Sequence, residues 1–525
     1  MTGLRPGRRD VLSGLCLLAA TAVGAVRFGG SAAAREPAAA GPGPETGSAP
    51  RELRGMWIAS VENIDWPAAS GLSADRLRAD FTDLLDHART IGLNAVFVQV
   101  RPTADAFWPS PFEPWSQWLT GVQGVDPGWD PLDFMVEAAH RRGLAFHAWF
   151  NPYRVSTQPD PGRLAADHPA RLNPHWAVAY DGRLYYDPGL PEVRRFVQRA
   201  MMDAVTRYEL DGVHFDDYFY PYPVAGQDFP DGATFAEHGA GFADRAAWRR
   251  HNVDLLVAEM SDLVRAARPE AAFGISPFGV WRNARSDPDG SDTAALQSYD
   301  ALHADTLHWI RSGWLDYVAP QLYWPIGFAA ADYATLAPWW AARTAGTDTQ
   351  LWIGQAVSRV GSPTPAGWQD PQELSRHLTL NAGLPQIGGN ILFSANHVRA
   401  DRLGAVSLLV ADHWARPALT PVLPRLSAAP GPPAPLVSVT GSGPDGLPLV
   451  FRGAADSTPF QYAVYGPAAP GPTSEADAAG PVAVVPGPVG RFTLADVGEA
   501  WRYAVTAVDR AGRESPATPV VRLSV

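Results

Sequence analysis

The sequence predicts an α/β fold, a (β/α)8 barrel followed by a small all-β sandwich. Between residues 53 and 418, eight short runs rich in β-branched and aromatic residues alternate with longer amphipathic stretches. This alternation is typical of a parallel sheet covered by helices. A Pro-rich stretch follows at residues 418–435, and the tail beyond it alternates large apolar with other residues, as a sandwich strand does.

Length and composition indicate a multidomain enzyme. The chain has 525 residues, of which 46% are hydrophobic and 18% charged, so it contains more than one small core needs. It also contains 19 Trp beside 49 Gly and 50 Pro, a composition that favours a loop-rich enzyme with stacking surfaces. The net charge of −12 disfavours nucleic acid as a partner.

The N-terminus resembles a twin-arginine export signal, which we expect to span residues 1–34. Arg8 and Arg9 precede an apolar run, and small residues follow at positions 32–34, where a signal peptidase would cut. The run is shorter than the roughly 20 residues that span a bilayer, although an uncut N-terminal anchor stays open as an alternative. Cys16 follows Leu15, so lipid anchoring is not expected, and the mature chain would lack disulfides. An extracellular or cell-envelope protein is predicted.

The first folded unit is the barrel, predicted over residues 51–417 after a Pro/Gly/Ala linker at 35–50. Its strands are predicted at residues 55–60, 95–101, 145–151, 212–216, 273–276, 317–323, 351–357 and 390–396. Because side chains alternate along a strand, one set of each strand faces the lumen. The side chains predicted to face it are Phe97, Gln99, Arg101, His147, Trp149, Asn151, His214, Asp216, Gln321, Tyr323, Ser394 and Asn396.

Polar inward residues gather at the C-terminal ends of these strands, where barrel enzymes place their active sites. A single buried polar residue is more often a satisfied core group, but five strands aiming polar groups at one mouth favour a site. The loops after the strands add many aromatic residues. Aromatic rings around a polar pocket suit sugar rings, so a carbohydrate substrate is predicted.

Several motifs make the prediction specific and resemble the glycosyl hydrolase-like 10 family over about residues 51–417. They are Arg54-Gly-Met-Trp-Ile-Ala-Ser, Gln99-Val-Arg-Pro-Thr-Ala-Asp-Ala-Phe-Trp, Trp149-Phe-Asn-Pro-Tyr-Arg, Gly212-Val-His-Phe-Asp-Asp-Tyr, Gly274-Ile-Ser-Pro-Phe-Gly and Asp316-Tyr-Val-Ala-Pro-Gln-Leu-Tyr-Trp. The resemblance implies a bacterial envelope or secreted glycosidase with a TIM barrel. Some relatives act on peptidoglycan glycan strands that lack peptides. The tail, residues 436–525, resembles a fibronectin type III module.

The segment Asp211-Gly-Val-His-Phe-Asp-Asp-Tyr also looks like the catalytic strand of chitinases. It has His214 and Tyr218 where that motif needs Asp and its acid Glu, so chitinase chemistry through that Glu is excluded.

Glycoside hydrolysis usually needs two carboxyl groups. Asp216 is the first candidate, because the strand period places it in the lumen beside His214, which could hydrogen-bond it and tune its pKa. Asp105 in the loop after the second strand is placed second. Glu62 is a further candidate, and so is Asp217 if the chain kinks, since the same period points Asp217 away from the lumen.

The remaining predicted site residues would bind substrate. They are Trp57, Glu62, Arg101, His147, Asn151, Tyr153, Arg154, His214, Tyr218, Trp281, Gln321, Tyr323, Trp324 and Asn396. No cofactor or metal is expected, although Asp105 and Asp216 binding a cation stays an alternative. The expected partner is a polysaccharide or peptidoglycan glycan, and a monomer is expected. Two other readings stay open, a glycan-binding pseudoenzyme and a polysaccharide deacetylase, which would need a metal cluster.

Overall fold

The computed structural model describes residues 51–440, 446–454, 457–468, 480–494 and 502–521. The predicted signal peptide and first linker therefore lie outside the described residues. Among the helices of the part that is described, none combines the length and the apolar character needed to cross a membrane.

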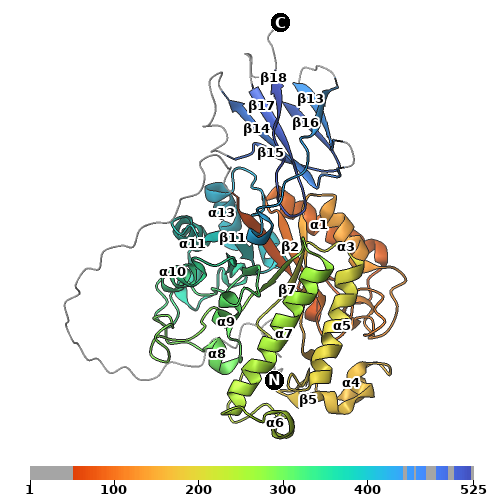
Figure 1. The fold of residues 1–525 in the computed structure, drawn as a ribbon, viewed down its shortest axis with the longest axis vertical. Coiled ribbons are helices and arrows are strands. Elements are labelled where there is room, and N and C mark those ends of the chain that lie inside the picture. Colours follow the sequence, from red (N-terminus) through yellow and green to blue (C-terminus); the bar gives the residue numbers. More distant parts are fainter. Residues whose placement is uncertain (1–50, 441–445, 455–456, 469–479, 495–501, 522–525) are drawn as a thin grey trace, which may run out of the picture. The chain divides into compact units, whose positions relative to one another are not determined.

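Eight parallel strands close into a barrel in the order β1-β11-β10-β9-β8-β7-β3-β2, which confirms the predicted fold (Figure 1). Each of the eight predicted runs forms one of these strands. Their bounds are β1 Leu53–Ile58, β2 Ala95–Arg101, β3 Ala145–Phe150, β7 Gly212–Phe215, β8 Ala272–Ile275, β9 Tyr317–Val318, β10 Gln350–Gln355 and β11 Ile387–Leu392.

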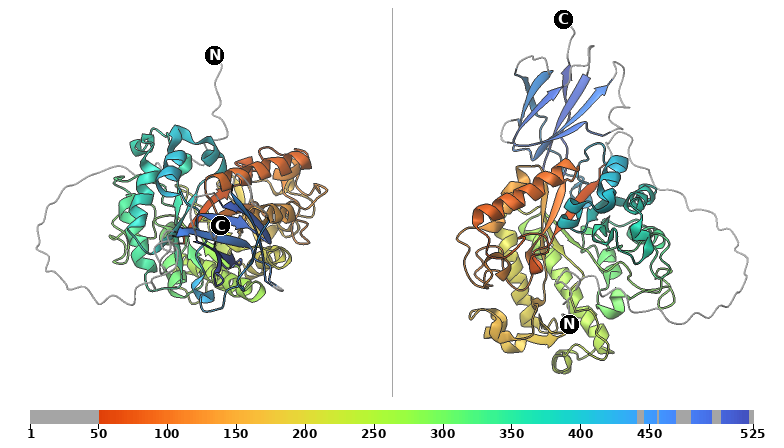
Figure 2. Two further views of the ribbon diagram at one scale, coloured as in Figure 1. Left: turned by 90° about the horizontal axis from the view of Figure 1, so that it is seen from above. Right: turned by 180° about the vertical axis from the view of Figure 1, so that it is seen from behind.

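A helix follows every strand on the outside of the barrel, as Figures 1 and 2 show. Side-chain caps explain where several begin, because Ser73 accepts from the Arg76 amide and Asp244 from the Ala247 amide. The outer helices are α1 Ala74–Thr90, α3 Pro131–His140, α5 Pro191–Arg207, α7 Arg245–Ala267, α9 Thr306–Arg311, α10 Tyr333–Thr344, α11 Glu373–Ala382 and α13 Ala405–His413. Shorter helices in the loops are α2 Gln117–Thr120, α4 Pro169–Leu172, α6 Gly232–His238, α8 Ser298–Ala301 and α12 Ala395–Ala400.

The alternation predicted for β2 and β3 holds. Val96 and Val98 pack in the large cluster shared with the helices, whereas Phe97 and Trp149 belong to a separate cluster inside the barrel. The lumen is therefore a filled core below its mouth. The other large side chains of this inner cluster are Trp57, Tyr317, Trp352 and Ile391.

Two strands, β9 and β11, end four or more residues earlier than predicted. β9 stops at Val318 rather than continuing to residue 323, because Pro320 has no amide hydrogen to continue the ladder. Gln321 keeps only isolated bridges to Phe278 and Gly354. β11 ends at Leu392 and α12 begins at Ala395, so the predicted last strand turns into a helix before residue 396.

A small antiparallel sheet that the sequence did not reveal follows β3. It consists of β4 Arg154–Ser156, β6 Arg183–Tyr186 and β5 Ala177–Tyr180, in that order. Arg154 pairs with Tyr185 in this sheet, so the sheet fixes the backbone that carries the Arg154 side chain.

The first part of the predicted linker at 418–435 packs against the barrel. Leu419 and Leu423 are buried, and the Arg425 Nε donates to Asp316 Oδ1 at 2.7 Å, just before β9. The Gln350 side chain donates to the carbonyl of Val422 at 2.7 Å. These contacts lie at the N-terminal end of the strands, opposite the mouth that the sequence predicts for the site.

The tail forms two antiparallel sheets, which confirms the predicted small all-β unit. One sheet has the order β12-β13-β16 and the other β15-β14-β17-β18, and Phe451, Tyr462 and Val505 pack in their shared core. The bounds are β12 Leu436–Val439, β13 Leu447–Arg452, β14 Gln461–Ala468, β15 Ala483–Pro486, β16 Val489–Leu494, β17 Arg502–Val508 and β18 Thr518–Val521.

Candidate active site

Asp216 stands directly after β7 and is held by three donors. Its Oδ2 accepts from the Asn151 Nδ2 at 2.5 Å and from the Trp149 Nε1 at 3.2 Å. Its Oδ1 accepts from the backbone amide of Tyr218 at 2.9 Å. The two side-chain donors come from the end of β3, the neighbouring strand, so the closed barrel itself fixes the orientation of this carboxylate.

Asp217 does not point away from this mouth, as the strand period had predicted. Its Oδ1 accepts from the Gln321 Nε2 at 3.0 Å, and the Tyr222 hydroxyl donates to its Oδ2. The physical reason is that β7 ends at Phe215, so the alternation no longer governs residues 216 and 217. Two consecutive carboxyl groups therefore lie together at one strand end.

The two carboxyl groups interact electrostatically. Burial raises the pKa of Asp216, while the Arg154 charge and the three donors oppose that rise. Burial and the neighbouring Asp216 charge raise the pKa of Asp217 to about 6. Because Asp216 has more donors and a nearby cation, we infer that it carries the negative charge. Asp217 then keeps its proton into weakly acidic conditions.

Asn151 is oriented by its own neighbours. Its Oδ1 accepts from the Gln99 Nε2 at 2.6 Å and from an Arg154 NH2 at 2.9 Å. With its oxygen occupied in this way, the Asn151 amide nitrogen must face Asp216. Arg154 also donates from Nε to the carbonyl of Pro102 at 2.9 Å, which fixes the guanidinium between the loops after β2 and β3.

Arg101 was predicted to bind substrate, but it instead holds the backbone that carries Asn151. It is fully buried, pairs with Glu113 at 2.5 Å and donates to the backbone carbonyls of Asn151 and Pro152. The register of β2 against β3 shifts between Gln99 and Arg101, which breaks the alternation that had placed Arg101 in the lumen.

His147 and His214 lie inside the filled barrel below the mouth. His214 Nε2 accepts from the Trp57 Nε1 at 3.0 Å, and its Nδ1 contacts the Tyr317 hydroxyl at 2.9 Å. His147 Nδ1 lies 3.3 Å from the same hydroxyl. Burial lowers the pKa of both rings, to about 4 for His147, so both are neutral. The side-chain donors that hold Asp216 therefore come from the end of β3 rather than from His214.

Asp105 is fully buried in a different group of contacts. Its Oδ1 accepts from Thr103, and its Oδ2 accepts from the Gln123 side chain at 3.4 Å. Burial raises the pKa of Asp105 to about 6. These contacts stay within residues 103–123, so the structure brings to Asp216 its chain neighbour Asp217 rather than Asp105.

Aromatic side chains form a row beside Asp217. Neighbouring ring centroids in the row Tyr218, Tyr222, Phe278 and Trp324 lie 5.4, 6.2 and 5.4 Å apart. The Arg154 guanidinium lies 5.3 Å from the centroid of the Tyr218 ring. Tyr323, which pairs with Phe393 at 5.8 Å, lies near both carboxyl groups, whose charges help burial to raise its pKa. Tyr218 and Tyr222 are half-buried, whereas Phe278 and Trp324 are buried in the core that the barrel shares with its helices, so only the Tyr218–Tyr222 end of the row could contact a sugar ring.

Other predicted site residues lie elsewhere. Asn396 is exposed, and its backbone amide donates to Asp65 Oδ1 at 2.8 Å, because α12 rather than a strand carries it. Glu62 is also exposed, in a loop where it adopts φ 54°. Tyr153 and Trp281 are buried in the core that the barrel shares with its helices.

The prediction missed Trp149 and Tyr222 as site residues. Trp149 had been placed correctly in the lumen, and Tyr222 lies among the aromatic residues that follow β7. What the sequence could not show is that their polar atoms bind the two carboxyl groups.

Sequence comparison identifies the family of this chain. A family model described as glycosyl hydrolase-like 10 matches residues 52–371. The chain belongs to the glycosyl hydrolase-like 10 family. This confirms the predicted family and, with it, the predicted class of enzyme, a glycoside hydrolase.

Two named relatives each align with 72% of this glycosyl hydrolase-like 10 protein. Glycosyl hydrolase YngK of Bacillus subtilis (strain 168) is 49% identical over 379 residues, which cover 72% of this chain and 74% of that protein. Glycosyl hydrolase DigH of Escherichia coli (strain K12) is 39% identical over 399 residues, covering 72% and 91%. Among solved structures, the PgaB (BpsB) glycoside hydrolase domain from Bordetella bronchiseptica aligns with a TM-score of 0.45 and 16% identity, over 69% of this chain and 98% of that one.

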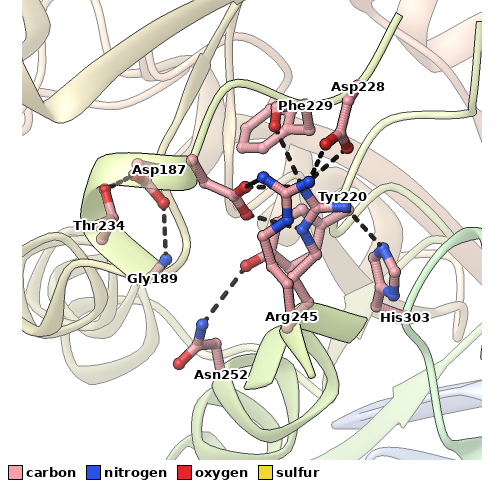
Figure 3. A network of polar contacts seen from close by, with 11 residues as sticks. Asp187, Gly189, Tyr220, Asp228, Phe229, Thr234, Arg245, Asn252 and His303 are labelled. Carbon is pink, nitrogen blue, oxygen red and sulfur yellow. Dashed lines mark hydrogen bonds and ion pairs between the residues drawn. The ribbon is translucent and has the colours of Figure 1, made fainter. Parts of the chain in front are cut away.

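The loop that carries both carboxyl groups is anchored by a charged network (Figure 3). At its centre, Arg249 of α7 donates to both carboxylate oxygens of Asp231, at 2.6 and 2.7 Å, and to Asp228 at 3.1 Å. It also lies 3.3 Å from the His303 Nε2 and 5.5 Å from the ring centroid of Tyr220. Asp228, Asp231 and Tyr220 all follow β7. Arg249 therefore links the loop after β7 to α7.

We expect Arg249→Met to lower the free energy of unfolding by about 3 kcal/mol or more, because it leaves the fully buried Asp231 without its main partner. Urea unfolding of the purified protein measures this. Arg199→Met, at an exposed position on α5, is the control and should change stability by less than about 0.5 kcal/mol. Equal stability of the two variants would show that the network does not anchor the loop.

We expect Tyr222→Phe to move the alkaline limb of the pH profile of kcat/KM to higher pH. The Tyr222 hydroxyl lowers the pKa of Asp217, so removing it raises that pKa above about 6. An acid that must be protonated is active below its pKa and is lost as the pH rises through it. The pH dependence of kcat/KM measures the shift, with Tyr299→Phe as the control. A limb that stays in place, or moves to lower pH, would show that activity does not depend on a protonated Asp217 held by Tyr222.

Proposed function

We propose that this protein hydrolyses the glycosidic bonds of a polysaccharide, with Asp217 as general acid and Asp216 as the charged partner. The glycan strands of peptidoglycan are the first substrate to test. The observation that carries the proposal is the pair of adjacent carboxyl groups at the C-terminal mouth of the barrel, one held by three donors and the other with its pKa raised to about 6.

Each carboxyl group suits one part of the reaction. A carboxyl group with a raised pKa can protonate the glycosidic oxygen as the bond breaks. A fixed carboxylate beside it stabilises the positive charge that develops on the sugar ring. The half-buried rings of Tyr218 and Tyr222 support a sugar bound next to Asp217.

We expect Asp216→Asn to lower kcat by roughly 10³-fold, because it removes the charge while keeping the shape. Asp217→Asn should cost roughly 10²-fold or more by removing the proton donor, a larger loss than the strand period alone had predicted. New reducing ends on purified peptide-free glycan strands measure both. Asp83→Asn, at an exposed position on α1, is the control.

Full activity in either aspartate variant would contradict its role. Binding of the strands without any new reducing ends from the unaltered protein would favour a glycan-binding pseudoenzyme instead.

We also propose that the protein is exported by the twin-arginine route, on the basis of Arg8, Arg9 and the apolar run that follows. Replacing both arginines by lysine should leave precursor in the cytoplasm, as cell fractionation would show. Normal export of that variant would contradict this route.

A further inference from the structure

We propose that Gln99 is a positioning residue of this site. Its side-chain amide fixes the direction of a row of hydrogen bonds that ends on Asp216 and keeps Asp216, rather than Asp217, ionised. This inference rests on the proposed function, because it concerns how the same two aspartates divide their roles. It follows from the atoms that bind Gln99 at one end of the row and Asp216 at the other.

The row begins in the loop after β1. Gln99 lies on β2 and is fully buried, and its Oε1 accepts from the backbone amides of Ser60 and Val61, both at 2.9 Å. A backbone amide can only donate, so the oxygen of Gln99 must face these two groups. Turning the side-chain amide over would set its NH2 group against two N–H donors, which is costly in a buried place.

The row continues from one strand to the next. Gln99 Nε2 donates to Asn151 Oδ1 at 2.6 Å, and Asn151 Nδ2 donates to Asp216 Oδ2 at 2.5 Å. The strands β1, β2, β3 and β7 are adjacent in the closed barrel, so the row follows their order. Every group in the row before Asp216 is a neutral amide, and each amide donates towards the carboxylate.

Asp216 depends on this direction because only one of its donors can be reversed. The Trp149 indole and the Tyr218 backbone amide can only donate. The Asn151 side chain carries both a donor and an acceptor, and turning it over would present its oxygen to Asp216. An Asp216 carboxyl group could then keep a proton and donate it to that oxygen. With Gln99 in place, the same turn would bring two NH2 groups face to face.

Asp217 has partners of a different kind. The Tyr222 hydroxyl donates to Asp217 Oδ2 and could equally accept from a protonated carboxyl group. Gln321 Nε2 binds the other oxygen of Asp217. A proton on Asp217 therefore finds an acceptor without any side chain changing its place, whereas a proton on Asp216 does not. The proton of the pair consequently belongs to Asp217.

Other charged and titratable side chains also face Asp216. They are Arg154 of β4, Asp217 and Tyr218 after β7, and Tyr323 after β9. Arg154 donates to Asn151 Oδ1 at 2.9 Å and so shares the orienting role, but its charge acts on Asp216 as well. Gln99 is neutral. Replacing Gln99 therefore weakens the direction of the row without removing a charge.

The test replaces Gln99 by methionine, which has a similar volume but no amide. Asn151 can then turn over, which raises the pKa of Asp216. In the proposed reaction Asp216 must be ionised, so activity is lost as the pH falls through its pKa. We expect the acid limb of the kcat/KM profile on peptide-free glycan strands to move to higher pH by roughly one pH unit.

Gln355→Met is the matched control. Gln355 is also fully buried at the end of a barrel strand, β10, and its Nε2 donates to the Tyr333 hydroxyl at 2.8 Å and to Asn390 Oδ1 at 3.0 Å. Both variants leave buried partners unpaired, so both should lose stability in urea. Only Gln99→Met should move the acid limb. If that limb stays in place, or moves equally in both variants, Gln99 only supports the fold and the inference is overturned.

A carbon-13 NMR titration of the Asp216 carboxyl carbon gives a readout that needs no activity. Its midpoint should rise in Gln99→Met and stay unchanged in Gln355→Met, and an unchanged midpoint in Gln99→Met would overturn the inference even where hydrolysis is found. If Gln99→Met does not fold, Gln99→Asn takes its place, because the shorter amide cannot span from Ser60 to Asn151. Strands left uncut by the unaltered protein would refute the proposed function, while the titration would still decide the role of Gln99.

Discussion

The site depends on the burial of two consecutive carboxyl groups, Asp216 and Asp217, at the point where β7 ends. A buried carboxylate is costly unless donors or cations compensate it. Asp216 receives three hydrogen bonds and the field of Arg154, whereas Asp217 receives two hydrogen bonds and the repulsion of Asp216. This asymmetry divides the pair into an anion and an acid.

Much of the surrounding structure maintains that asymmetry. Gln99 and Arg154 orient Asn151, and the buried pair of Arg101 and Glu113 fixes the backbone of Asn151. On the other side of β7, the Arg249 network anchors the loop that follows Asp217. Few of these residues would contact a substrate. A shift of any of them would nevertheless change the difference in pKa between Asp216 and Asp217. The filled core of aromatic and histidine side chains below gives the mouth a rigid floor.

The strand alternation of residues 95–100 and 145–150 could be predicted from sequence, because apolar residues at every second position leave only one register for a buried strand. The closed barrel followed from the number of such strands. Prediction failed where alternation stops. A register shift moved Arg101, Pro320 ended β9 early, and α12 replaced the end of the last predicted strand, which moved Asn396 to the surface. Asp217 was misplaced for the same reason. No local sequence pattern shows which polar side chains contact one another in the fold. The hydrogen bond from Tyr222 to Asp217 is an example.

Asp216 and Asp217 share one charge at weakly acidic pH if the pair works as an anion and an acid. A carbon-13 NMR titration of the aspartate carboxyl carbons measures this, with the two asparagine variants used for assignment. We expect the Asp217 carboxyl to titrate near pH 6, and its midpoint to fall when Asp216 is replaced by asparagine, because the neighbouring negative charge is gone. If both carboxyl groups instead titrate independently near about pH 4, the value for an isolated aspartate, the two do not divide into an anion and an acid.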